Sequence, residues 1–130
     1  MTLLGESVLV AIGGGIGAVG RYIVSRLAIS AGVTHIGGFP LVTMAVNVTG
    51  CFLVGFIFSL LERNGSLQEG GRLFLVVGFL GGFTTFSAFG LETFTVIRES
   101  GWGECLFFIG ITMVSALLAV SAGRLIANYF

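Results

Sequence analysis

The sequence predicts an all-α integral membrane protein with four spanning helices. Hydrophobic residues make up 55% of its 130 residues and charged residues only 9%, whereas about a quarter of the residues in a soluble domain are charged. A soluble fold of this size would therefore expose large apolar patches. The chain also contains four apolar runs separated by polar stretches, each near the ~20 residues that a helix needs to cross a ~30 Å hydrocarbon core.

Each apolar run is expected to be helical, because lipid offers no partner for free backbone groups. Arg21 interrupts the first run, Pro40 suits the first turn of the second, and the third has no ionisable residue before Glu92. No basic leader or small-residue cleavage site precedes the first run, so we expect a retained helix rather than a signal peptide. The predicted helices of this single transmembrane domain cover about residues 3–27, 40–61, 73–97 and 105–127.

The arginines predict insertion in both orientations. An excess of Lys and Arg on one side normally fixes the orientation of a membrane protein. With four spans, each side receives three arginines: Arg63, Arg72 and Arg124 on the side of the N-terminus, and Arg21, Arg26 and Arg98 on the other. We therefore predict dual topology and an antiparallel homodimer. The alternative is a weak bias that a partner or the insertion machinery resolves.

Composition also excludes several classes of function. The formal net charge is zero and no basic patch is present, which excludes nucleic acid as a partner. Cys51 and Cys105 lie in apolar runs without a CxxC pattern, and the chain has one histidine, so neither a zinc site nor a disulfide framework is expected. We interpret both thiols as small buried hydrophobes.

A glycine-rich segment in the first predicted helix has two interpretations. Gly15, Gly17 and Gly20 match the GxGxxG pattern of dinucleotide-binding folds, but the strand, the βαβ unit and the acidic residue that this pattern requires are missing. Gly13 and Gly17 form a GxxxG pair, which lets membrane helices approach closely. We favour helix packing.

Two polar residues inside the spans need partners. An unpaired Arg21 would cost several kcal/mol in lipid, so we expect it to cap carbonyls at a helix end or to reach the headgroups. It could also raise the positive potential at an anion's entrance. Asn47 lies near the middle of the second span, where an unpaired amide is costly. Two roles remain open for it: an interhelical hydrogen bond, or an N–H donor that faces a small anion.

The strongest local signal lies in the third span. Adjacent glycines and hydroxyl residues are poor helix formers, which predicts a break, and freed carbonyls at such a break can coordinate a cation. Phe86 and Phe89 would share one helix face. The positive edges of their rings could meet an anion, although a phenylalanine stripe more commonly faces lipid or the core. The segment reads Gly81-Gly82-Phe83-Thr84-Thr85-Phe86-Ser87-Ala88-Phe89.

Three segments, taken in order, resemble signatures of the Fluc (CrcB) family of fluoride channels. They are Gly17-Ala18-Val19-Gly20-Arg21-Tyr22, Asn47-Val48-Thr49-Gly50 and the third-span segment 81–89. The third is specific and the first two are weak alone, but their spacing in a chain of this size argues against accidental agreement. The resemblance spans all four helices. The resemblance implies an antiparallel dimer with two narrow fluoride pores and a sodium ion at the dimer centre.

The resemblance also implies roles for individual residues. Asn47 would be the pore amide, and Phe86 and Phe89 the paired pore rings. Sodium would be a structural ion, held by the backbone carbonyls of Gly81 and Thr84. Hydroxyls beside the rings would come from Thr85 and Ser87, and the fourth helix would add Thr112, whereas Phe108 stands where some relatives have tyrosine. Arg21 and Glu92 would serve the vestibule or the structure.

The expected function is therefore passive, selective export of fluoride from the cytoplasm by a multi-pass protein of the inner (plasma) membrane. The main alternative is a proton-coupled small-molecule exporter that depends on Glu92, although such exporters need a carboxylate deep within a span. A scaffold subunit is a third possibility. An enzyme is not expected, because Ser87 has no catalytic partner in the spans and His35 lies in a connection.

Overall fold

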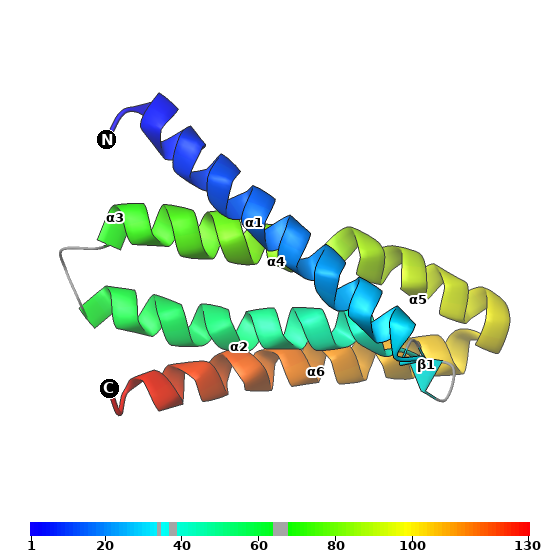
Figure 1. Cartoon of the computed structure of the whole chain (residues 1–130). Coiled ribbons are helices and arrows are strands. Elements are labelled where there is room, and N and C mark those ends of the chain that lie inside the picture. Colours follow the sequence, from blue (N-terminus) through cyan, green and yellow to red (C-terminus); the bar gives the residue numbers. More distant parts are fainter. Residues whose placement is uncertain (34, 37–38, 64–67) are drawn as a thin grey trace.

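The computed structural model describes residues 1–33, 35–36, 39–63 and 68–130. Within them, four helical spans are long and apolar enough to cross a membrane, which confirms the predicted all-α membrane fold. The side chain of His35 lies outside the described part. The elements are α1 (Leu3–Ser30), the antiparallel two-residue strands β1 (His35–Ile36) and β2 (Phe39–Pro40), α2 (Leu41–Arg63), α3 (Gln68–Gly71), η1 (Arg72–Leu80), α4 (Gly81–Phe83), α5 (Phe86–Ser100) and α6 (Trp102–Ala127) (Figure 1).

Local sequence explains where several helices begin and end. The Thr2 hydroxyl accepts a hydrogen bond from the amide of Gly5 at 3.3 Å, which caps the start of α1. Gly101 separates α5 from α6 with φ 102°, a conformation that glycine adopts without steric cost. A single residue therefore reverses the chain between the last two helices.

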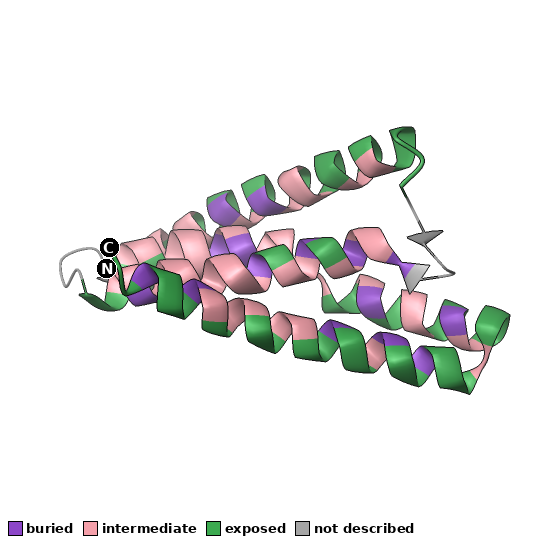
Figure 2. Cartoon of the chain, turned by 90° about the horizontal axis from the view of Figure 1, so that it is seen from below, coloured by how far each residue is buried: buried purple, intermediate pink, exposed green. Residues whose placement is uncertain are grey.

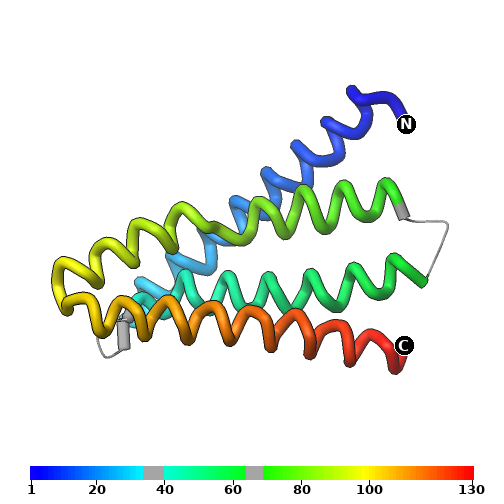
Figure 3. Tube along the Cα trace, turned by 180° about the vertical axis from the view of Figure 1, so that it is seen from behind, coloured from blue at the N-terminus to red at the C-terminus, as the bar shows by residue number. Residues whose placement is uncertain are grey.

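The third span is broken, as predicted. It begins with α3, continues as the π-helical η1 and the short α4, and loses its helical path at Thr84 (ψ 160°) and Thr85 (φ −151°, ψ 119°). Figure 3 shows this interruption between the green and yellow parts of the tube. The chain then resumes as α5, with Thr85 as its N-cap.

The helices pack in two groups: α2 against α6, and α1 across η1 and α4. A Cβ at Gly13 or Gly17 would collide with the carbonyl oxygens of Phe74 and Phe79. These glycines therefore allow backbone-to-backbone contact, which agrees with the packing interpretation. The same kind of contact joins α2 and α6, where a Cβ at Gly55 would collide with the carbonyl oxygen of Val120.

Few side chains are buried within one chain. Phe108, Leu80 and Cys105 are the largest fully buried side chains. In Figure 2 the buried positions are short, scattered segments of the helices, and intermediate and exposed positions make up most of the ribbon. Large apolar residues such as Leu117 and Leu118, each 66% exposed, lie on that outer surface, as expected for helices that face lipid.

Candidate functional site

A cavity of about 280 Å³ lies beside the break in the third span. It brings together residues of α2, the break, α5 and α6, which are far apart in the sequence. Five of the six predicted pore residues line it: Asn47, Thr85, Phe86, Phe89 and Thr112. The rest of the lining is Gly50, Cys51, Val54, Thr84, Met113 and Ala116. The cavity therefore combines amide, hydroxyl and aromatic groups without an ionisable acid or base other than the thiol.

Asn47 holds the broken segment in place. Its Nδ2 donates to the carbonyl oxygen of Thr85 at 3.0 Å, and its Oδ1 accepts from the Thr85 amide at 2.8 Å. The side chain thus satisfies both backbone groups of a residue that has left the helix. The interhelical hydrogen bond expected for this amide is present. Because Nδ2 carries two hydrogens, one donor remains for a second role.

Ser87 is the predicted pore residue that does not line the cavity. Its exposed hydroxyl lies 3.2 Å from the Thr85 hydroxyl, which also accepts a hydrogen bond from the Ala88 amide at 3.2 Å. Ser87 is therefore linked to the cavity only through Thr85.

The two predicted pore rings differ sharply in burial. Phe86 is 81% exposed and Phe89 only 8% exposed, and their ring centroids lie 5.8 Å apart. Phe89 also contacts Phe108, with centroids 5.5 Å apart. Phe108 is fully buried, so an apolar ring from α6 packs against Phe89.

Thr112 lines the cavity and carries a buried hydroxyl. The residue is 5% exposed, and its Oγ1 has no hydrogen-bond partner among the described residues. A buried hydroxyl without a partner loses its solvation without compensation. This hydroxyl is therefore the clearest sign that a hydrogen-bond acceptor is missing from the site.

The break exposes backbone carbonyl oxygens, and Arg21 bonds to one of them. Arg21 Nε donates to the carbonyl oxygen of Gly82 at 3.3 Å, which matches the expected capping of carbonyls. The carbonyl oxygens of Gly81 and Thr84 accept no hydrogen bond from other parts of the described chain. Two backbone oxygens near the break are therefore available to a ligand.

Glu92 lies inside the third span, because α5 continues to Ser100. Its Oε1 accepts a hydrogen bond from the Thr43 hydroxyl at 2.6 Å. Sequence reasoning did not single out Thr43. A usable signal was its spacing, because Thr43, Asn47 and Cys51 are each four residues apart and so lie on one face of α2.

The two cysteines occupy different environments. Cys105 is 1% exposed, as predicted. Cys51 is only partly buried and lines the cavity, so the interpretation of this thiol as a buried hydrophobe is wrong. The reason is the helix break, which leaves open space opposite this turn of α2.

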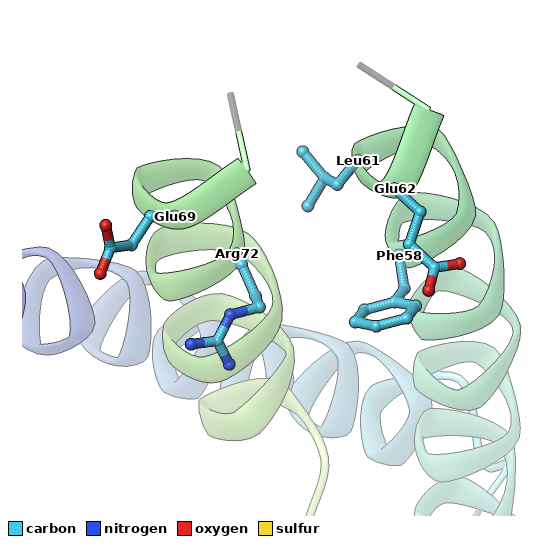
Figure 4. Close-up of a pocket in the computed structure, with 5 residues that line it drawn as sticks. All are labelled: Phe58, Leu61, Glu62, Glu69 and Arg72. Atoms are coloured by element: carbon cyan, nitrogen blue, oxygen red, sulfur yellow. The ribbon is translucent and has the colours of Figure 1, made fainter. Parts of the chain in front are cut away.

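A second hollow, of about 430 Å³, lies at one end of the bundle between α2 and the start of the third span. In Figure 4, Glu69 and Arg72 extend from the third span, and Phe58, Leu61 and Glu62 extend from α2. The charged residues that line this hollow lie at the ends of the helices rather than in the middle of the spans. The cavity at the break is therefore the better candidate site.

Four spans, a break at membrane depth and an uncharged polar cavity beside it define a multi-pass membrane protein of the channel or transporter class. The family model "CrcB-like protein, Camphor Resistance (CrcB)" matches residues 8–124. This chain belongs to the CrcB family, as its resemblance predicted.

Curated relatives named "Fluoride-specific ion channel FluC" match over most of the chain, and three of them illustrate the similarity. The protein from Azobacteroides pseudotrichonymphae genomovar. CFP2 is 38% identical and covers 98% of this chain and 100% of its own length. The protein from Legionella pneumophila (strain Lens) is 41% identical (92% and 87% covered). The Bacteroides fragilis protein is 39% identical (96% and 98% covered). Their names describe ion channels and not enzymes, which agrees with the prediction.

Proposed function

We propose that this chain forms a passive, selective fluoride channel with the cavity beside the break as part of its conducting path. The observation that carries the proposal is the Thr112 hydroxyl, a buried donor without a partner in the described chain, on a residue that lines the cavity together with Asn47 and two phenylalanines. The relatives named as fluoride channels agree with this chemistry.

An uncharged lining suits a small, strongly hydrated anion. A channel must replace enough of the ion's water to admit it, yet must hold it weakly enough for release. Hydroxyl and amide N–H groups donate hydrogen bonds, and aromatic edges carry partial positive charge. Thr112, the second Nδ2 hydrogen of Asn47, and the ring edges of Phe86 and Phe89 supply such groups without a full positive charge that would trap the anion.

The path is completed by a second copy of the chain in an antiparallel homodimer. Phe86 is 81% exposed although it borders the cavity, so one wall of the path is open in a single chain. The arginines support dual insertion: with Arg21 engaged at the break, the helix ends carry Arg63, Arg72 and Arg124 on one side against Arg26 and Arg98 on the other. Neither side holds a strong excess.

The carbonyl oxygens of Gly81 and Thr84 would hold a structural sodium ion at the dimer centre. Sodium is a hard cation that suits oxygen donors, and broken membrane helices offer carbonyls for this purpose. The two oxygens fit this role, because neither accepts a hydrogen bond from elsewhere in the described chain. Bound there, the ion would supply positive charge that offsets the negative ends of these carbonyl dipoles.

The channel would export fluoride from the cytoplasm across the inner (plasma) membrane. HF crosses the bilayer and ionises inside the cell, so the anion accumulates there and leaves down its own gradient. No energy source is needed.

The test is fluoride efflux from liposomes that contain the purified protein, followed with a fluoride-selective electrode. We expect rapid efflux, no comparable efflux of chloride, and slower fluoride efflux for Asn47→Ala and Phe86→Ala. A folded protein that releases no fluoride, or that releases chloride equally fast, would overturn the proposal. Proton-coupled uptake of a cationic dye would support the exporter instead.

A further inference from the structure

Cys51 occupies a place in the cavity that its sequence context did not suggest. It follows Asn47 by four residues on α2, so the thiol lies one helical turn along the same face as the amide that holds the break. It shares the cavity lining with Thr85, Phe86 and Thr112. The other thiol, Cys105, is 1% exposed and does not line this cavity.

The Thr112 hydroxyl is a second, independent sign that this part of the cavity takes a ligand. Hydroxyls inside membrane helices commonly bond to the carbonyl four residues earlier. Ser59, Thr84, Thr93 and Ser121 all do so in this chain, at 2.7–2.9 Å. Thr112 Oγ1 makes no such bond, although it is buried. Its hydroxyl is therefore free for an acceptor that enters the cavity next to the thiol's helix.

We propose that the Cys51 thiol lines the conducting path and is a modification site at which a small thiol-directed reagent closes that path. The inference rests on the proposed channel function. The cavity holds about 280 Å³ and is lined by residues of α2, the break, α5 and α6. A group added to the sulfur would take up part of the space through which the anion would pass, because Cys51 shares this lining with Asn47, Phe86 and Thr112.

Methyl methanethiosulfonate is a suitable probe, since it is small and uncharged. The Cys51 thiolate attacks the methylthio sulfur of the reagent, and a new S–S bond forms as the bond between the two reagent sulfurs breaks. Methanesulfinate leaves with the electron pair, and the thiol proton goes to the buffer. The reaction needs no separate oxidant.

The experiment compares fluoride efflux from proteoliposomes before and after treatment, so that each variant is its own reference. We expect treatment to slow efflux from the native chain by about tenfold or more, because the added group obstructs the cavity that forms part of the proposed path. Cys105→Ala should remain fully sensitive. Cys51→Ala should show the same rate before and after treatment, whatever that rate is. Reduction with dithiothreitol should restore the native chain.

Mass spectrometry and gel filtration make each outcome decisive. Stoichiometric labelling of Cys51 without slower efflux would show that the thiol lies outside the path. Absence of labelling while the channel conducts would show that the thiol is not accessible from it, and equal inhibition of Cys51→Ala would assign the effect to another site. If labelling disrupts the dimer on gel filtration, the inhibition is structural and the proposal fails.

The failures of the two proposals are distinguishable. Untreated protein that conducts fluoride and is unaffected by labelling removes only the role of Cys51. Untreated, folded protein that does not conduct fluoride removes the channel function itself. Cys51→Ser provides a second variant, since it keeps a small donor but cannot form the disulfide and should resist the reagent.

Discussion

Replacing Asn47 by alanine tests whether a single side chain fixes the geometry of the broken span. The substitution removes two hydrogen bonds, of 3.0 and 2.8 Å, between the amide and the backbone of Thr85. Thr85 stands between α4 and α5 as the N-cap of α5. Its N–H and C=O would therefore each lose the hydrogen bond to α2.

The expected loss of stability follows from the cost of these two bonds. Interhelical hydrogen bonds in membrane proteins contribute on average ~0.6 kcal/mol and at most ~1.7 kcal/mol each. Asn47→Ala should therefore lower the free energy of unfolding by about 1–3 kcal/mol, since a backbone group left unsatisfied adds to the loss. Fluoride efflux should fall as well, because the break and the rings that follow it would no longer be hydrogen-bonded to α2.

Reversible unfolding in mixed detergent micelles, followed by circular dichroism, measures this loss. The matched control is Thr49→Ala, which removes a hydroxyl from an exposed position on the same helix and should change stability by less than about 0.5 kcal/mol. If Asn47→Ala is as stable as the native protein, the amide does not hold the break. If both variants lose equal stability, the effect reflects loss of a polar residue from α2 and not the bond to Thr85.

Three further predictions address packing, the hydroxyl and the ion. Gly17→Ala should lower the free energy of unfolding by about 1–3 kcal/mol in the same assay, because its Cβ would meet the Phe79 carbonyl. Gly15→Ala, with open space around it, should be neutral or stabilising, and equal effects of the two variants would contradict the close packing of α1. Thr112→Val should slow fluoride efflux but leave stability unchanged or raised, because the hydroxyl has no described partner. A stability loss of about 1–3 kcal/mol would instead reveal a hidden hydrogen bond. Exchange of sodium for N-methylglucamine throughout purification should reduce fluoride efflux, and re-addition of sodium should restore it; unchanged efflux would argue against a required ion.

Much of the fold could be predicted from the sequence, because membrane helices depend on few rules. Length and hydropathy define the spans, since lipid leaves the backbone no other partner. The break was also predictable, because two glycines followed by hydroxyl residues weaken a helix at one point. The GxxxG pair at Gly13 and Gly17 correctly indicated close packing, although its partner carbonyls at Phe74 and Phe79 carry no sequence signal.

The residues of the site could be predicted from the sequence, but their contacts could not. Asn47 stood out as an amide in the middle of a span and Phe86 as a ring beside the predicted break, whereas Thr112 was named through the resemblance to the Fluc family. That Asn47 bonds to both backbone groups of Thr85 depends on how α2 faces the break, which local sequence does not determine. Cys51 was misinterpreted for the same reason: an apolar sequence context suggests burial, but the open cavity arises from residues more than 30 positions away in the sequence.

Stability and permeation depend on the same residues in this protein. A straight third helix would satisfy its own backbone but would leave no free carbonyls and no open space opposite Asn47. The break takes the Thr85 amide out of the helical ladder, and a polar side chain on α2 accepts its hydrogen bond instead. That side chain keeps one donor for the cavity because an amide nitrogen has two hydrogens. Substitutions that strengthen the third helix should therefore stabilise the fold at the expense of the path, and the two effects should be opposite in sign.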